Sequence, residues 1–275
     1  MIWFIQPSIS AEFMRNLGGK MTTNFFDNIQ KWQIERNGTQ GLLPAFYFDN
    51  LFLTGVYSAS TKRVRELIPH TDLHPVELWP GRCLVAFTAF EYRKPEIEPY
   101  NEFSISFIVS YKKIPIPIIS AIKAFSSSVL AVYVWQLPVT TEAARTGGVD
   151  FYNYPKFLSD IRFIKTKDTV TCILKDSNTE ILRMIGKIIP TKEVSPIRYV
   201  SYTVMQNNLL AINTLVNPLE FGVSNHNDDV VIQIENEHPL GQEINKLGLG
   251  KHPLSYQFSP RNESILFPAR NVRDL

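Results

Sequence analysis

The chain has 275 residues, of which 44% are hydrophobic and 12% aromatic, so it can bury a large core in one big domain or two small ones. This composition excludes disordered and fibrous proteins. Its 28 basic and 26 acidic side chains leave a formal net charge of only +2, and we therefore expect neither nucleic acid nor a membrane surface as a partner.

The first part of the chain is predicted to be an extension that packs on the main body. Residues 1–42 are loosely patterned and end in the polar loop RNGTQG. Within them, Phe25, Ile29 and Trp32 have helical spacing, which predicts a helix over 22–33 packed by these rings. No linker divides the rest, so residues 43–275 are expected to form one domain.

From about residue 51 onward, segments rich in β-branched and aromatic residues alternate with turn residues, which is typical of strands. The predicted strands are 51–57, 83–92, 102–111, 129–137, 169–175, 181–189, 198–206, 210–216 and 229–235. In the third of them, apolar side chains alternate with serines, which predicts one dry face and one polar face that could line a cavity.

Helices are expected to be few and short. The segment STKRVRELIP predicts a helix that Ser60 caps and Pro69 ends, and PLGQEINKLG predicts a late surface helix closed by Gly248. The apolar segment 116–126 fits either a buried helix or a lid. So many strands with so few helices predict an α+β fold that is mainly antiparallel β, with a large barrel-like sheet and a few flanking helices.

Nothing in the sequence indicates export or metal binding. The amino terminus has no positively charged region and its apolar stretch stops at residue 5, and no segment approaches the ~18 to 20 apolar residues of a membrane span. Cys83 and Cys172 lie in apolar runs typical of buried thiols, and the five histidines have no metal-ligand spacing. We expect a reduced, cytoplasmic protein that needs no metal or other cofactor.

One lysine has unusual neighbours. Lys156 follows Pro155 in FYNYPKFLSDI, among four aromatic rings. A lysine amine is a nucleophile only as the free base, and removal of water from the ammonium favours that form. The local sequence by itself favours a turn whose lysine stem lies along the rings while its head reaches water.

The order of further motifs favours the first interpretation. TGGVDFYNYPKF resembles the acetoacetate decarboxylase family, whose nucleophilic lysine stands in a Tyr-Pro-Lys motif. FDNLFLTGVYSASTKRVRELIP is similar to the opening strand and helix of that family, and EPYNEFSISFIVSY to the strand that presents a glutamate to the lysine. The resemblance covers about residues 45–165 and continues more faintly to SPRNESILFPAR. It implies a large antiparallel β-barrel with flanking helices and a homo-oligomer.

The resemblance also implies site residues. Lys156 would be the nucleophile, and Glu102 would act as the general acid and base. The active-site arginine of the family falls at Asn50 and its other buried glutamate near Phe87, so both charges are missing here. Phe157 stands where the family often has a second lysine, which leaves desolvation as the main influence on Lys156.

Three further residues are candidates for substrate binding. Tyr154 belongs to the aromatic surroundings of Lys156, Tyr100 offers a hydroxyl, as Tyr92 and Tyr152 also do, and Arg145 offers an anion contact on a loop made flexible by Gly147 and Gly148. Because asparagine cannot replace the bidentate contact of arginine with a carboxylate, a more apolar ketone or keto acid than acetoacetate is expected.

The leading functional hypothesis is a lysine Schiff-base enzyme that acts on a small keto acid or ketone and cleaves a carbon–carbon bond as a decarboxylase does. Related aldolase or dehydratase chemistry is an alternative. A second alternative is a catalytically silent barrel that binds a small apolar ligand, with Lys156 neutralised in a salt bridge. A purely structural subunit is the third, and it would have no enclosed cavity beside Lys156.

Overall fold

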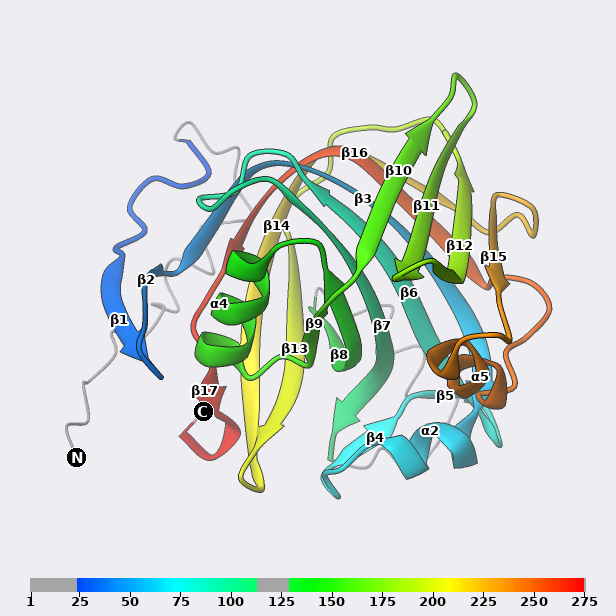
Figure 1. Ribbon diagram of the computed structural model, residues 1–275, viewed down its shortest axis with the longest axis horizontal. Coiled ribbons are helices and arrows are strands. Elements are labelled where there is room, and N and C mark those ends of the chain that lie inside the picture. Colours follow the sequence, from blue (N-terminus) through cyan, green and yellow to red (C-terminus); the bar gives the residue numbers. More distant parts are fainter. Residues whose placement is uncertain (1–23, 113–128, 275) are drawn as a thin grey trace.

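The computed structural model describes residues 24–112 and 129–274, and its centre is a closed barrel of seven strands (Figure 1). The barrel strands are β3 (Ala45–Ser60), β6 (Arg82–Tyr92), β7 (Tyr100–Tyr111), β8 (Val129–Val139), β13 (Ile197–Met205), β14 (Asn208–Ser224) and β16 (Ser255–Leu266). They follow the order β7–β6–β3–β16–β14–β13–β8, and pairing between β8 and β7 closes the ring. Within the barrel β8 and β13 are parallel and the other neighbours antiparallel. The predicted, mainly antiparallel barrel is confirmed.

A four-stranded antiparallel sheet covers one side of the barrel. Its strands, in spatial order, are β10 (Asp160–Lys165), β11 (Thr169–Asp176), β12 (Thr179–Lys187) and β15 (Val230–Ile234). The largest hydrophobic core lies between this sheet and the barrel, where Leu53 and Phe103 share one cluster with Cys172 and Met184. The barrel strands beneath the sheet are therefore buried on both faces.

The alternation predicted for β7 appears in the structure as two different buried environments. Phe103 and Ile105 belong to the core under the outer sheet. Ser104 and Ser106 lie on the opposite face, inside the barrel, where their hydroxyls are 2.7 Å apart. A second hydroxyl pair in the interior, between β3 and β6, has its oxygens 2.9 Å apart. These pairs satisfy polar groups that would be costly to bury alone.

Two of the predicted helices are confirmed. They are α2 (Thr61–Leu67) and α5 (Pro239–Lys246). Ser60 occupies the position before α2, but its side chain makes no capping hydrogen bond. Gly248 has φ +62°, the left-handed conformation that ends a helix. The predicted helix or lid over 116–126 lies outside the described residues.

The predicted helix over 22–33 is wrong. Of its described residues, 25–28 form a turn, and Trp32 already belongs to a strand. The Asn24 side chain accepts a hydrogen bond from the amide of Phe26, and Asn28 has φ +64°, so local turn chemistry prevails over the apolar spacing.

The polar loop RNGTQG is the turn of a hairpin. It joins β1 (Trp32–Arg36) to β2 (Thr39–Leu43), and these pair antiparallel. Asn37 and Gly38 both have positive φ, 53° and 81°, as the favoured two-residue hairpin turns require. The hairpin lies beside helix α4 (Glu142–Tyr152) and leads directly into β3 (Figure 1).

Helix α4 replaces the flexible loop that the sequence suggested for Arg145. The Thr141 hydroxyl accepts a hydrogen bond from the amide of Ala144 and Glu142 stands in the first turn, which favours a helix start despite Gly147 and Gly148. Arg145 therefore projects from a helix and pairs with Glu142.

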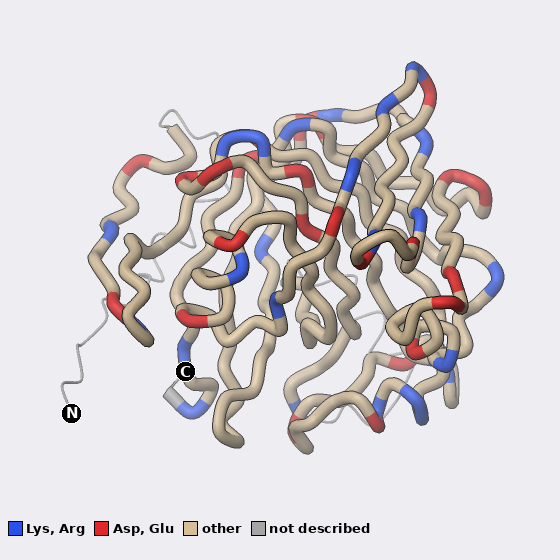
Figure 2. The backbone as a smooth tube through the Cα atoms, in the orientation of Figure 1, with Lys and Arg blue, Asp and Glu red and all other residues tan. Residues whose placement is uncertain are grey.

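Short elements complete the described part of the chain. They are β4 (Leu73–Pro75) beside β7, β5 (Glu77–Trp79) beside β6, β9 (Lys156–Leu158) beside β8, β17 (Arg270–Asn271) beside β14, and the 3₁₀ turn Val272–Asp274. Charges of both signs are scattered along the chain (Figure 2). Among the described residues, no helix is long and apolar enough to cross a membrane, and no three acidic, histidine or cysteine side chains are grouped to hold a metal ion.

Candidate active site

The position of Lys156 is set by the sharp end of α4. Asn153 follows the helix with φ 54°, a left-handed conformation that Asn tolerates, and its amide donates to the carbonyl of Val149. The amide of Tyr154 then donates to the carbonyl of Gly148 at 3.1 Å. This reversal sends the chain into β9, where Lys156 stands opposite Leu137 of β8 in a parallel pair.

Sheet register brings Glu102 to the same place. Glu102 of β7 stands opposite Val139 of β8, and Val139 stands opposite Leu158 of β9. Directly opposed residues and alternate residues share a face of a sheet, so Glu102 and Lys156 project to the same side. Neighbouring strands, rather than neighbouring sequence, create this pair.

Lys156 and Glu102 form a buried ion pair. The Lys156 Nζ lies 2.7 Å from Glu102 Oε2, and the two side chains are only 7% and 8% exposed. The contact has the distance of a hydrogen bond but not its angles, so Oε2 has no hydrogen-bond donor in the described structure. The other oxygen, Oε1, accepts from the hydroxyl of Tyr92 at 3.2 Å. Because the pair is almost completely buried, the stability of the protein depends strongly on both charged side chains being present.

Three tyrosines surround this pair. The Nζ of Lys156 lies 5.4 Å from the ring centroid of Tyr100, within the range of a cation–π contact. The Tyr100 ring packs on that of Tyr92 at 4.6 Å, and its hydroxyl lies 3.4 Å from the Tyr47 hydroxyl. Burial raises the pKa of Tyr47, Tyr92 and Tyr100 well above the usual value. They are therefore neutral hydroxyls at physiological pH.

Tyr154 is fixed on the other side of Lys156. Its hydroxyl and that of Ser201 in β13 are 2.6 Å apart, and its ring stacks on Tyr152 with centroids separated by 5.6 Å. Burial raises the pKa of the Tyr154 hydroxyl beyond its ordinary range. This locked ring fixes the residue two positions before the lysine and so limits the freedom of the lysine backbone.

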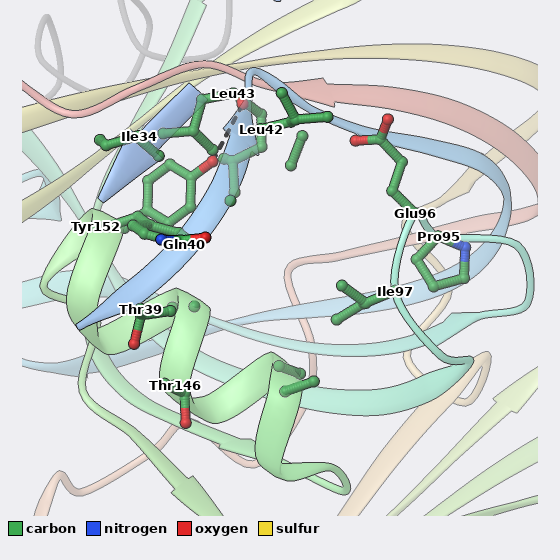
Figure 3. Close-up of a pocket in the computed structure, with 18 of the residues that line it drawn as sticks. Ile34, Thr39, Gln40, Leu42, Leu43, Pro95, Glu96, Ile97, Thr146 and Tyr152 are labelled. Atoms are coloured by element: carbon green, nitrogen blue, oxygen red, sulfur yellow. Dashed lines mark hydrogen bonds between the residues drawn. The ribbon is translucent and has the colours of Figure 1, made fainter. Parts of the chain in front are cut away.

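A pocket of about 970 Å³ opens next to Lys156. The hairpin β1–β2 with the start of β3, the loop 95–97 and the inner face of α4 form its walls (Figure 3). Leu266 of β16 also lines it. Lys156, Tyr100 and Tyr154 line this pocket, as do Tyr47 and Tyr152. Glu102 contacts Lys156 but is not part of the wall, so it lies behind the lysine.

The structure does not bring the other sequence-predicted binding residues to this pocket. Asn50 is 1% exposed and holds β3 to β16, because its Nδ2 lies 3.3 Å from both Asn262 Oδ1 and Ser264 Oγ. Phe87 packs edge to face on Tyr57 in the core under the outer sheet. Arg145 is held by Glu142 and is not among the lining residues, although its neighbours on α4 are.

Comparison with known proteins places this arrangement in a family. The family described as acetoacetate decarboxylase (ADC) matches residues 33–207, which include Lys156, Glu102 and most of the pocket wall. This chain belongs to the acetoacetate decarboxylase family. The resemblance seen in the Tyr-Pro-Lys motif is confirmed at the level of the family. A search of curated proteins finds no match.

Several solved structures share the fold of this chain. One structure of acetoacetate decarboxylase has 16% sequence identity to this chain and a TM-score of 0.59, and the match covers 83% of this chain and 89% of that one. Acetoacetate decarboxylase from Legionella pneumophila is 14% identical with a TM-score of 0.60, and the match covers 90% and 93%. The enduracididine biosynthesis enzyme MppR, complexed with pyruvate, is 11% identical with a TM-score of 0.58, and the match covers 83% and 90%.

Sequence reasoning missed the outer part of this site. The hairpin β1–β2, the loop 95–97 and the glycine face of α4 were not predicted to form a wall, and neither was Tyr47. Only Asn37-Gly38, a strong hairpin signal, indicated the first of these. The rest depends on contacts between segments far apart in the sequence.

Proposed function

We propose that this chain is a lysine Schiff-base enzyme that acts on a keto acid or ketone and breaks a carbon–carbon bond on the carbon adjacent to the carbonyl, as a decarboxylase does. One observation carries the proposal. The Lys156 side chain is only 7% exposed, lines a large pocket and places its amine 2.7 Å from a buried carboxylate. Membership of the acetoacetate decarboxylase family and the likeness in fold to MppR, which was solved with pyruvate, support the same chemistry.

Glu102 is placed to take a proton from the ammonium of Lys156. An ordinary lysine has a pKa of about 10.4, so roughly one molecule in a thousand carries the free amine at neutral pH. Transfer of a proton from Lys156 Nζ to Glu102 Oε2, 2.7 Å away, gives the free amine that the reaction needs. Phe157 brings no second cation to the nucleophile. Glu102 is therefore the group that is placed to activate the amine.

The reaction then proceeds through an iminium ion. The free amine of Lys156 adds to the substrate carbonyl, and the carbinolamine loses its oxygen as water, with Glu102 returning the proton. The bond from the adjacent carbon to its carboxylate breaks, carbon dioxide leaves, and the bonding electrons move to nitrogen to give an enamine. Protonation of that carbon, followed by addition of water, releases the ketone and restores the lysine. No oxidant or reductant is required.

The same iminium serves the related reactions. Loss of a proton rather than a carboxylate from the adjacent carbon, with Glu102 as base, gives the enamine of aldol or dehydration chemistry. The pocket beside Lys156 argues against a purely structural subunit, because such a subunit needs no cavity there.

A catalytically silent barrel is the second candidate, and the ion pair itself favours it. Lys156 is paired with a carboxylate at 2.7 Å, and the charged positions that the resemblance implies at Asn50 and Phe87 are absent. In that case the pocket would bind an apolar ligand without any covalent step.

Reductive trapping separates the two candidates. Incubation with a panel of ketones and keto acids at neutral pH, addition of borohydride and mass analysis of peptides should give a stable adduct on Lys156. The Lys156→Arg variant keeps a cation beside Glu102 but cannot form the adduct. Lys165→Arg, which changes a lysine 42% exposed and paired with Glu91, is the matched control and should trap like the wild type. Absence of any adduct across the panel would identify the silent barrel.

A further inference from the structure

The charged residues that line the pocket are distributed unevenly. Among the described residues of the wall, Lys156 is the only cation, and Glu35, Glu96 and Glu142 are the acids. The acids all belong to the exposed rim, whereas Lys156 is at the buried end. No described basic side chain of the wall is available to receive a carboxylate away from the reacting carbonyl.

The acids at the rim already have partners of their own. Glu96 pairs with Lys31, and its Oε2 accepts from the amide of Phe46 at 2.9 Å. Glu142 pairs with Arg145. These contacts neutralise Glu96 and Glu142, and neither Lys31, whose Nζ lies 4.5 Å from the Phe46 ring centroid, nor Arg145 lines the pocket. Glu35 accepts a hydrogen bond from the uncharged side chain of Gln40.

The region between the rim and Lys156 is mainly apolar. Its buried or half-buried surfaces are Ile34, Leu43, Phe46, Phe151, Tyr152 and Leu266. Leu42 and Ile97, on opposite sides, extend this surface to the rim, where they are 53% and 44% exposed (Figure 3). The volume of about 970 Å³ is at the upper end of the range of roughly 300 to 1,000 Å³ for sites that enclose drug-sized ligands. A four-carbon keto acid would leave most of it unused.

We propose that the substrate is a carbonyl compound whose carbonyl carries an extended apolar body, about the size of a chain of six or more carbons or an aromatic ring, with no charge at its far end. This rests on the proposed function, because it assumes that the carbonyl reaches Lys156. A carboxylate on the carbon adjacent to the carbonyl is compatible with it, since that group lies beside the iminium cation and leaves as carbon dioxide. A distal carboxylate is not.

Two physical effects produce this selection. Each methylene that leaves water for the apolar wall raises affinity about fourfold, until the chain reaches the rim. A carboxylate in the same place loses hydration and gains no hydrogen-bonded cation, which lowers affinity by at least about tenfold.

Binding of a homologous ketone series tests the proposal. Calorimetric titration with butan-2-one, hexan-2-one and nonan-2-one, on the wild type and on Lys156→Arg, should show affinity that rises about threefold to fourfold per methylene. The arginine variant keeps a cation beside Glu102 and reports non-covalent binding alone; if it does not fold, the wild-type series stands by itself. The matched acid 8-oxononanoate should bind at least about tenfold more weakly than nonan-2-one.

A rim variant gives an independent readout. Ile97→Lys adds a cation at a half-exposed position of the wall and should raise the affinity for 8-oxononanoate by up to about fivefold, while affinity for nonan-2-one stays the same or falls. Ile164→Lys is the matched control, because Ile164 is 51% exposed on β10 of the outer sheet and lines no part of this pocket. It should change neither affinity.

The outcomes distinguish this inference from the proposed function. Affinity that is flat along the ketone series, or equal for the ketone and the distal acid, overturns the inference, even if borohydride traps every ketone on Lys156. A steep series without any trapped adduct supports the apolar selection and overturns the Schiff-base chemistry instead.

Discussion

Gly148 of α4 lies directly against the side chain of Lys156. A Cβ at position 148 would stand 2.3 Å from Lys156 Cδ and 2.5 Å from Cε, well inside van der Waals contact. The absence of a side chain in the second turn of α4 therefore gives the lysine the space through which it reaches Glu102.

Replacement of Gly148 by alanine should displace the reactive amine. We expect borohydride trapping at Lys156 to slow by at least about tenfold, because misplacement of a reacting group by about 1 Å is enough for losses of this size. Gly147→Ala is the matched control: its Cβ would meet only Phe151, at 3.7 Å, an ordinary contact. Both changes favour the helix equally. Equal trapping in the two variants would contradict this role of Gly148.

Removal of one member of the ion pair should destabilise the protein. Lys156→Met leaves Glu102 buried without its cation and should lower the free energy of unfolding by up to about 3–5 kcal/mol. The double variant Lys156→Met/Glu102→Gln removes both charges and should recover most of that loss. Urea denaturation measures all three proteins, and a double variant as unstable as the single one would show that charge is not the cause.

Tyr92 is expected to position the carboxylate. Its hydroxyl donates to Glu102 Oε1 at 3.2 Å, so Tyr92→Phe removes the hydrogen bond on that oxygen and should cost about 1.5–3 kcal/mol of stability. Trapping at Lys156 should also slow. Tyr47→Phe is the control, since the Tyr47 hydroxyl contacts that of Tyr100 and not Glu102. If Tyr47→Phe slows trapping as much as Tyr92→Phe does, the effect comes from the aromatic cluster.

The hairpin that forms one wall of the pocket is held to α4 by a carboxylate. The Asn37 side chain and the Thr39 hydroxyl donate to Asp150 at 3.0 and 2.5 Å, and these hydrogen bonds hold the pKa of Asp150 below its ordinary value of 3.8, with a smaller contribution from Arg145. Because the pKa of Asp150 is lowered in the folded state, this stabilisation is complete at pH values above the ordinary pKa. It is lost as the pH falls through the lowered pKa of the folded state.

Hydrogen exchange should show this dependence on pH. Amides of residues 32–43 should lose protection below about pH 4, relative to the amides of β14, as Asp150 takes up its proton. Asp150→Asn should exchange faster in the hairpin at neutral pH and lack that additional acid-induced change. An identical pH profile in both proteins would rule out Asp150 as the titrating group.

The two cysteines should be unreactive in the folded protein. Both are completely buried, and burial raises the pKa of the Cys83 thiol to about 12 and that of Cys172 beyond its ordinary range. Because the thiolate is the reactive form, neither should be alkylated at mildly basic pH until denaturant is added. Rapid labelling of the native protein would indicate opening of the core between the barrel and the outer sheet.

Local sequence was sufficient to predict an element where the pattern of side chains lies within that one element. Alternation of apolar residues with serines predicted the two faces of β7, and richness in β-branched and aromatic residues predicted the other long strands, because both patterns act within the strand itself. It failed at 22–33, where helical spacing was outweighed by the turn at Asn24–Asn28 and by pairing of Trp32 with Leu43. It also missed α4, because Gly147 and Gly148 look like a loop until Thr141 is seen to cap a helix.

The sequence by itself determined the composition of the site: one lysine after a proline among aromatic rings, and a glutamate that begins a strand in the order typical of a known family. Only the tertiary structure decided that these two groups meet at 2.7 Å, that Asn50 and Phe87 lie elsewhere, and that a hairpin, a loop and a helix enclose an apolar pocket. The physical reason is that register between strands and packing between distant segments fix which side chains share a space. Neither the register nor the packing can be predicted from a short stretch of sequence.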